Sequence, residues 1–495
     1  MGKTAITPAR TENYAEWYQQ VVRRADLAET SPVRGCMTIK PWGCRIWEIF
    51  KESLDRKLKE SGHENVYFPL LIPLRFLQKE AKHVEGFAKE CAVVTHSRLQ
   101  ADAQGRLMPS SPLEEPLVIR PTSETIVGEA FSRWIQSHRD LPLRLNQWAN
   151  VVRWEMRPRL FLRTTEFLWQ EGHTAHTVRE EALEETRHIL EIYRQTLEEE
   201  LAIPVWVGEK TAGERFPGAH DTFTLEAMMQ DGKALQCGTS HFLGQNFSRA
   251  MDIVFVDTDG QRKHAWTTSW GVTTRLIGGL VMTHSDDNGL VLPPKMAPLD
   301  MVVIPILGSG ESGATIGAYA DKLCAEANKL RWEGRFFRAH LDNRDIRGGE
   351  KRWDWIKKGV PIIAQVGLRE TQEETVSFVF RDDISRPHTT PQNLFLDQVG
   401  GHLSILQKRL FDRAKKFQEE HTQRVETAEE FYRFFHHQTG FAVGFWAEDA
   451  VVEERLKRDL KVTVRCLPLV HKDQRGNDLF TGHPNARMAI FAKSY

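Results

Sequence analysis

Hydrophobic residues recur at helical spacing in several stretches of the first half of the chain. Every fourth residue from Ile46 to Leu58 is apolar, which predicts a helix that ends near Gly62. Residues 14–22 predict an amphipathic helix packed on the main domain, and residues 178–202 predict a long charged helix with one apolar face. The intervening segments have the shorter apolar runs that are typical of strands.

Two apolar segments surround a basic stretch between residues 146 and 175. The pattern predicts two antiparallel strands joined by an arginine-rich loop. Arg153 and Glu155 are two residues apart, so we expect them to point to one face of the first strand. Three more arginines follow: Arg157, Arg159 and Arg163. This arrangement favours a phosphate-bearing ligand that also carries an amine, and an ordinary charged surface hairpin is the alternative.

The segment L-V-I-R-P-T-S-E-T predicts a strand that ends at Pro121 and a helix that follows it. Thr122 is typical of a helix N-cap, and Glu124 is favoured in the first helical turn by the helix dipole. The same carboxylate would suit a ligand's ammonium group, and the two interpretations are compatible. Residues 99–114, which precede this segment, predict a surface hairpin.

Residues 231–247 gather small and polar side chains near a predicted strand. Gln236, Thr239 and His241 are expected to cluster at the end of that strand. A purely structural histidine is the alternative for His241. Cys237 is predicted to be a buried small side chain, because no base partner for a nucleophile is visible.

Residues 266–280 predict a strand followed by a helix. The strand is expected to end near Trp270, Gly271 to make the turn, and Arg275 to lie at the helix start. An arginine in that position can reach a phosphate of a bound nucleotide. The Gly-x-x-x-Arg spacing alone is a weak signal.

The composition limits the classes of protein to which this chain can belong. The chain has 495 residues, which is enough for about three domains. The formal net charge of −1 argues against a protein dominated by nonspecific nucleic-acid binding, so any RNA contact needs a local basic patch. The six cysteines include no C-x-x-C pair, which argues against a disulfide framework and fits a reducing cytosol. No segment has the apolar length of a membrane span or of a signal peptide.

From residue 299 onward, strands and helices alternate, which predicts a small α/β sheet over residues 299–400. Residues 402–438 are predicted to be helical. Basic residues within the α/β sheet could form the local patch, with Trp353 and Trp355 available to stack on bases: Arg344, Lys351, Arg352, Lys357 and Lys358. For each of them, a solvated helix face over core tryptophans is the alternative.

The segment V-V-R-W-E, followed by F-L-R-T-T-E-F-L-W-Q-E-G-H, resembles motif 2 of the class II aminoacyl-tRNA synthetases. It is most similar to the prolyl-tRNA synthetases of the archaeal/eukaryotic-like type. Residues 46–73, with Pro69 in a predicted edge strand, resemble motif 1, and residues 266–280 resemble motif 3. The resemblance covers essentially the whole chain. It implies an α+β catalytic domain with an antiparallel sheet and helices (1–291), an α/β anticodon-binding domain (299–400) and a small α/β C-terminal domain (402–495).

The resemblance also implies ATP-dependent ligation of L-proline to tRNA(Pro) by a cytoplasmic homodimer, with Mg²⁺ accompanying ATP. Arg153 and Arg275 are the implied catalytic residues. The implied proline-binding residues are Thr122, Glu124, Arg153 and His241. The implied ATP-binding residues are Arg153, Glu155, Arg163, Thr164, Phe167, Gln236, Thr239, Thr273 and Arg275. The implied anticodon-binding residues are Arg344, Lys351 and Lys358.

The last part of the chain departs from the family. Archaeal/eukaryotic-like relatives usually carry zinc-binding cysteines there, whereas Asp478 and Thr481 stand at two of those positions and only Cys466 lies nearby. One thiol cannot make a tetrahedral zinc site, so we expect a degenerate site without zinc. The short stretch between motifs 2 and 3 leaves no room for the editing insertion of the bacterial-type enzyme.

Two other functions remain open at this point. The first is a class II ligase for another small amino acid, against which the T-S-E and Q-C-G-T-S-H segments argue. The second is a non-catalytic RNA-binding or regulatory paralog. Such paralogs usually lose a motif arginine, whereas Arg153 and Arg275 are both present.

Overall fold

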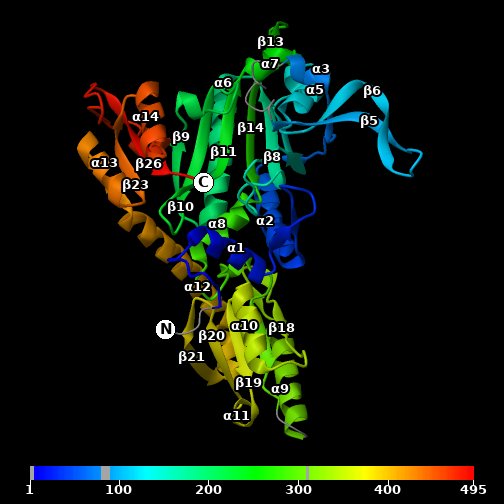
Figure 1. Cartoon of the computed structure of the whole chain (residues 1–495), viewed down its shortest axis with the longest axis vertical. Coiled ribbons are helices and arrows are strands. Elements are labelled where there is room, and N and C mark those ends of the chain that lie inside the picture. Colours follow the sequence, from blue (N-terminus) through cyan, green and yellow to red (C-terminus); the bar gives the residue numbers. More distant parts are fainter. Residues whose placement is uncertain (1–4, 80–89, 308–310) are drawn as a thin grey trace.

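A long, mostly antiparallel sheet organises the molecule (Figure 1). The computed structural model describes residues 5–79, 90–307 and 311–495. Within these residues the main sheet has 12 strands, in the order β22-β23-β26-β24-β9-β10-β11-β14-β8-β7-β3 with β25 beside β26. Its central strands are β7 (Leu143–Val152), β8 (Glu166–His176), β9 (Val205–Glu209), β10 (Asp221–Met228), β11 (Ala234–Gly244) and β14 (Trp266–Thr273). The predicted antiparallel sheet with helices is confirmed.

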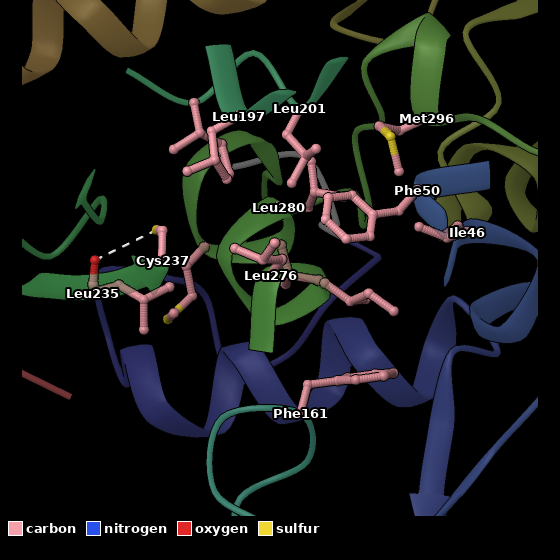
Figure 2. Packing of buried hydrophobic residues seen from close by; sticks show 14 of the residues in the cluster. Ile46, Phe50, Phe161, Leu197, Leu201, Leu235, Cys237, Leu276, Leu280 and Met296 are labelled. Carbon is pink, nitrogen blue, oxygen red and sulfur yellow. Dashed lines mark hydrogen bonds between the residues drawn. The ribbon is translucent and has the colours of Figure 1, made fainter. Parts of the chain in front are cut away.

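Four helices build the largest hydrophobic core of the described residues beside the sheet; three of them have one apolar face, and the last in the chain is buried on nearly every side. They are α1 (Tyr14–Arg24), α2 (Pro41–Glu60), α6 (Arg179–Gln195) and α8 (Arg275–His284). Figure 2 shows Leu276 and Leu280 of α8 beside Phe161, Leu201 and Phe50, which come from widely separated segments. The three helices predicted from apolar spacing are therefore confirmed. After α2, Gly62 adopts a φ of +85°, which suits a residue without a Cβ.

The predicted hairpin around residues 99–114 is present. It joins β5 (Ala92–Ala101) to β6 (Leu107–Ile119), projects from the body of the molecule, and pairs with β4 (Leu71–Pro73) (Figure 1). The edge strand predicted around Pro69 is present only in part, because β3 (Glu64–Asn65) ends before Pro69 and β4 begins after it. Phe68 instead donates its backbone N–H to the side chain of Gln147, while Pro69 has no N–H to give.

The helix predicted after Pro121 is α5 (Glu124–Trp134). Ser123 rather than Thr122 occupies the N-cap position, and no side chain caps the helix there. Thr122 donates its hydroxyl to Glu124 instead, so the N-cap prediction for Thr122 is wrong. The helix dipole still favours the carboxylate of Glu124 in the first turn.

A separate five-stranded sheet lies below the main sheet (Figure 1). Its order is β18-β15-β19-β20-β21, formed by β15 (Met301–Pro305), β18 (Ala339–Leu341), β19 (Ile362–Val366), β20 (Thr375–Phe380) and β21 (Asp383–Pro391). Helices α9 (Glu311–Ala327), α10 (Gly348–Lys358) and α11 (Leu368–Glu373) accompany it. This is the predicted α/β domain. Arg381 of this domain ties it to the main domain through a two-nitrogen contact to Asp286, at 2.9 and 2.7 Å.

Helix α12 (Gln392–Glu420) runs from the small sheet to the C-terminal part of the chain (Figure 1). It passes through the predicted boundary between residues 400 and 402, so one helix belongs to both predicted domains. Residues 402–438 are not helical throughout, because β22 (Thr422–Arg424) separates α12 from α13 (Ala428–His437). The remaining elements are β23 (Phe441–Trp446), α14 (Ala450–Leu460), β24 (Val462–Pro468), β25 (Arg475–Gly476) and β26 (Ala486–Lys493).

The C-terminal strands extend the main sheet. β24 pairs antiparallel with β9, with Leu467 opposite Glu209 and Pro468 opposite Gly208. The approach is close, since a Cβ on Gly208 would lie 2.5 Å from the side chain of Cys466. The last domain is therefore joined to the main sheet by strand pairing. Among the described residues, no helix is long and apolar enough to span a membrane.

We predict that His284 makes the fold sensitive to acid. This histidine is 1% exposed, hydrogen-bonds from Nε2 to the carbonyl of Leu201 at 2.8 Å, and has its pKa lowered by burial to about 3. Below the ordinary histidine pKa the unfolded chain binds a proton that the folded chain does not bind. The free energy of unfolding therefore falls as the pH falls from about 6.5 towards 3. His284 accounts for a loss of about 1.4 kcal/mol per pH unit over this range.

His284→Gln tests this, because an amide retains a donor for Leu201 but does not titrate. Between pH 7 and pH 5 the melting temperature of the variant should fall less than that of the unchanged protein. Other buried histidines are present in both proteins and cancel in the difference. An equal fall in the two proteins would contradict the prediction.

Candidate active site

One cavity of about 590 Å³ opens on the central strands of the main sheet. It is lined by all of the residues that the sequence proposed for ATP and proline: Thr122, Glu124, Arg153, Glu155, Arg163, Thr164, Phe167, Gln236, Thr239, His241, Thr273 and Arg275. These residues come from segments that are far apart in the chain and that the sheet brings together. Their convergence is a finding of the structure, whereas their individual roles remain predictions.

Arg153 lies at the mouth of the hairpin formed by β7 and β8. The sequence predicts that Arg153 and Glu155 share one face of the first strand. That prediction is wrong, because β7 ends at Val152 and both residues follow it. Nε of Arg153 donates to the carbonyl of Pro121 at 2.8 Å, and the guanidinium lies 5.6 Å from the centre of the Phe167 ring. These contacts fix the arginine between the hairpin and the start of α5.

A buried acid–base cluster forms one end of the cavity. Nε2 of His173 lies 3.7 Å from a carboxylate oxygen of Glu124 and 3.9 Å from one of Glu171. Burial alone would raise the pKa of Glu124, but His173 and the hydroxyl of Thr122 outweigh it and lower that pKa to about 2. Burial raises the pKa of Glu171, and the two carboxylates raise the pKa of His173 against its own burial. Glu124 is therefore a carboxylate at neutral pH, which suits a cationic ligand group.

His241 completes this end of the cavity. Burial lowers its pKa to about 4, so the ring is neutral near pH 7. Its Nδ1 lies 3.0 Å from the hydroxyl of Thr222, and its ring stacks on Phe216 at a centroid distance of 4.6 Å. The result is a small pocket with an anionic wall and an apolar wall.

The opposite end of the cavity is cationic. Arg275 begins α8, and its Nε donates to the carbonyl of Leu162 at 3.2 Å. Its pKa is lowered first by burial and then by the nearby charges of Arg163 and Arg153. Like charges held together in this way favour a polyanionic ligand. The turn predicted at Gly271 is wrong, since β14 continues to Thr273 and the helix follows at once.

A β-bulge aligns Gln236 with the other lining residues. The sequence predicts Gln236 and Thr239 at the end of a strand, whereas both residues lie within β11. Two residues three apart on a regular strand face opposite sides. In the pairing with β10, Leu225 is opposite Gly238 but Glu226 is opposite Gln236, so Cys237 is the extra residue. The bulge reverses the alternation and lets both side chains line the cavity.

Cys237 is buried, as predicted. Burial raises the pKa of its thiol to about 12, and its Sγ donates to the carbonyl of Leu235 at 3.5 Å (Figure 2). A thiol with so high a pKa is not a nucleophile at neutral pH.

The sequence motifs do not identify several other lining residues: Trp169, Glu171, Lys210, Phe216 and Ser269. They also do not identify His173, which lies behind the lining beside Glu124 and Glu171. Trp169, Glu171 and His173 alternate along β8, so period-two reading of the segment W-Q-E-G-H could have found them. The contribution of the loop that carries Lys210 and Phe216 depends on tertiary packing and has no comparable sequence signal.

The predicted anticodon residues lie on or beside α10, and two of them are engaged in packing. Lys351 is 2% exposed and donates from Nζ to the carbonyl of Asp342 at 3.0 Å. Lys358 pairs with Asp26 of the main domain at 3.2 Å and lies over the ring of Trp42. This placement argues against RNA contacts for both lysines. The sequence showed that they are basic but not which side of the helix they occupy.

Arg344 is the most accessible of the three predicted anticodon residues. Its side chain is 47% exposed and pairs with Asp342 and Asp354, at 2.7 and 3.2 Å. An exchange of these pairs for a phosphate is chemically reasonable for an arginine on a surface.

Family models match three parts of the chain. Residues 108–284 match the tRNA synthetase class II core domain (G, H, P, S and T), and residues 300–395 match an anticodon binding domain. Residues 428–495 match the model described as prolyl-tRNA synthetase, C-terminal. The cavity described above lies largely within the first of these regions.

Whole-chain comparisons agree with the models. The proline--tRNA ligase of Protochlamydia amoebophila is 55% identical over 503 residues, covering 100% of this chain and 99% of that protein. The proline--tRNA ligase of Bdellovibrio bacteriovorus is 52% identical over 501 residues, covering 100% of both chains. The crystal structure of prolyl-tRNA synthetase from Cryptosporidium parvum complexed with L-proline and AMP has a TM-score of 0.90 at 36% identity, covering 99% of this chain and 97% of that one. The chain therefore belongs to the class II prolyl-tRNA synthetase family.

Proposed function

We propose that this protein ligates L-proline to tRNA(Pro) in an ATP-dependent reaction that passes through prolyl-adenylate. The observation that carries the proposal is a single cavity with a cluster of arginines at one end and the carboxylate of Glu124 at the other. The arginines match a triphosphate, and the carboxylate matches the secondary ammonium of proline. Mg²⁺ would enter with ATP as part of the nucleotide substrate.

In the first step, the carboxylate of proline attacks the α-phosphate of ATP in line, and pyrophosphate leaves. In the second step, a ribose hydroxyl at the end of tRNA attacks the carbonyl of the adenylate, and AMP leaves. No side chain becomes covalently attached, so catalysis consists of positioning and neutralisation of charge. The protein's part is to hold both substrates in one geometry.

The lining residues predicted from the sequence receive roles that their positions support. Arg153, between the two ends of the cavity, contacts the α-phosphate and the carboxylate of proline. Glu155 accepts from the adenine amine, and Phe167 stacks on the adenine ring. The remaining phosphate and nucleotide contacts come from Arg163, Thr164, Gln236, Thr239, Thr273 and Arg275. The pocket for proline comprises Thr122, Glu124 and His241, to which we add Glu171; His173 supports the carboxylate of Glu124 from outside the lining.

Arg153→Ala should lower proline-dependent exchange of pyrophosphate into ATP on the order of 100-fold or more, because it removes a charge that stabilises the transition state. Arg157→Ala is the matched control. Arg157 is an exposed arginine on the same loop and is not among the residues that line the cavity. Near-normal exchange by Arg153→Ala, or an equal loss in both variants, would overturn the role of Arg153. The same assay across amino acids tests the alternative of a ligase for another small amino acid.

We further propose that the enzyme is of the archaeal/eukaryotic-like type without an editing insertion. Support comes from residues 177–265, between β8 and β14. This stretch holds α6, β9, β10 and β11, which pack on or join the main sheet. Its other described elements are short: η3 (Thr196–Glu200), η4 (Ala212–Glu214), α7 (Asn246–Ala250), β12 (Val254–Val256) and β13 (Arg262–His264). None of these described elements forms a separate domain.

Preformed Ala-tRNA(Pro) tests this proposal. The protein should not accelerate deacylation above the spontaneous rate, because the described elements of residues 177–265 include no separate domain for hydrolysis. Pro-tRNA(Pro) serves as the control for nonspecific hydrolysis. Rapid enzyme-dependent deacylation of the alanyl species would contradict the proposal.

The C-terminal residues do not fit the zinc site of the family. The carboxylate of Asp478 accepts from the backbone N–H groups of Ala447, Phe480 and Thr481, at 2.7 to 2.9 Å, and from the hydroxyl of Thr481. Burial raises the pKa of Cys466 to about 12, so this thiol does not offer the thiolate that zinc requires. We propose that hydrogen bonds to Asp478 replace a metal in holding this turn.

Protein produced with added zinc should therefore carry well below one zinc per chain, and a chelator should leave its melting temperature unchanged. Asp478→Ala should lower the melting temperature, because several backbone donors lose their acceptor. One firmly bound equivalent of zinc would contradict the proposal.

A homodimer in the cytoplasm, with Arg344 near the anticodon, completes the proposed function. These three points rest on family resemblance and on the placement of Arg344. The non-catalytic alternative is less well supported, because both Arg153 and Arg275 line the cavity.

A further inference from the structure

A buried cluster of charges joins the C-terminal domain to the wall of the active-site cavity. Glu226 on β10 is 0% exposed and binds two cations. Lys210 donates from Nζ to one of its carboxylate oxygens at 2.8 Å, and Arg465 on β24 donates from Nε and Nη2 to the other, at 3.1 and 3.0 Å. Nζ of Lys210 also donates to the backbone carbonyl of Arg465 at 2.8 Å. The carboxylate of Glu226 thus binds Lys210 of the main domain and Arg465 of the C-terminal domain.

The cluster is stable only as a set. Burial alone would raise the pKa of Glu226, but Arg465 and Lys210 outweigh it, so the pKa is lowered and the group is anionic. Removing one member of a buried ion pair leaves an uncompensated charge and disturbs the positions of the others. The position of Lys210 therefore depends on a residue of the C-terminal domain.

Lys210 begins the loop of residues 210–217, which lines the cavity beside the proposed proline pocket. At the far end of this loop, the backbone N–H of Phe216 donates to the hydroxyl of Thr222 at 3.0 Å. The ring of Phe216 stacks on His241, and the same hydroxyl of Thr222 lies 3.0 Å from His241. A shift of the loop would therefore reach the pocket directly.

A second set of ion pairs also connects the loop of residues 210–217 to the C-terminal domain. Glu209, the residue before Lys210, accepts from Arg215 of the loop at 3.4 Å and from Arg487 on β26 at 2.9 Å. Glu209 also stands opposite Leu467 in the pairing of β9 with β24. Both cavity-lining cations of the loop, Lys210 and Arg215, are thus held by carboxylates that also bind arginines of the C-terminal domain.

We propose that Glu226 and Glu209 are positioning residues through which the C-terminal domain sets the shape of the amino-acid pocket. Arg465 and Arg487 hold the two carboxylates, the carboxylates hold Lys210 and Arg215, and the loop between them carries Phe216 against His241. The domain therefore acts on the affinity for the amino acid rather than on the nucleotide. This inference rests on the proposed function of the cavity in binding proline.

Two variants of the full-length protein test the proposal. Arg465→Lys keeps the positive charge but loses the two-nitrogen grip on Glu226. Arg487→Met removes the partner of Glu209 at a position where the arginine side chain is 30% exposed, so the fold tolerates it more easily. Arg381→Lys is the matched control, because Arg381 is also a buried arginine that joins a domain to the main domain but does not line the cavity.

Proline-dependent pyrophosphate exchange is measured with proline and ATP varied separately, together with thermal melting. Arg465→Lys should raise the KM for proline about 10-fold and Arg487→Met about 3-fold, with the KM for ATP within twofold of the unchanged protein. Arg381→Lys should lower the melting temperature and leave the KM for proline within twofold. A purely structural role would lower kcat or the folded fraction without this selective change in KM.

The proposal is overturned if both C-terminal variants keep the original KM for proline, or if the KM for ATP rises equally. If Arg465→Lys does not fold, the result for Arg487→Met decides alone. Failure of the proposed function is a separate outcome, since the unchanged protein would then show no proline-dependent exchange at all.

Discussion

The constraint on which the site depends is the electrostatic cost of holding several arginines together away from water. Burial lowers the pKa of the Arg275 guanidinium, and the nearby charges of Arg163 and Arg153 lower it further. Such a cluster is compensated when a polyanion enters, so the folded protein is prepared for a triphosphate before the ligand arrives. The carboxylate of Glu124, kept ionised by His173 at the other end of the cavity, provides the opposite preference for an ammonium group. In the proposed function, one cavity therefore orients two substrates by the sign of its charges.

The main sheet makes this separation of charge possible. β8 and β14 are paired along their length, from Trp169 opposite Thr273 to His176 opposite Trp266. The phosphate end and the amino-acid end thus lie on one rigid surface. The same sheet continues through β9 into β24, so the C-terminal domain is built into the support of the pocket rather than attached at its edge. This continuity explains how residues near the end of the chain can influence a site whose substrates they do not touch.

The sequence predicted most of the elements and twelve of the residues that line the cavity, because each motif is local. Helical spacing identified α2, and short motifs identified Arg153 and Arg275. The failures have tertiary causes. The bulge at Cys237 depends on pairing with β10, and the burial of Lys351 depends on which side of α10 faces the small sheet. The contact between Arg465 and Glu226 joins residues separated by 239 positions, and no local pattern contains it.

The most direct test of the account is a crystal structure of the protein with proline and a non-hydrolysable analogue of ATP. We predict that the guanidinium groups of Arg153 and Arg275 both contact the phosphates of one bent triphosphate. The ring nitrogen of proline should lie within hydrogen-bonding distance of Glu124. A complex in which either guanidinium points to bulk solvent, or in which proline binds away from Glu124, would contradict the account.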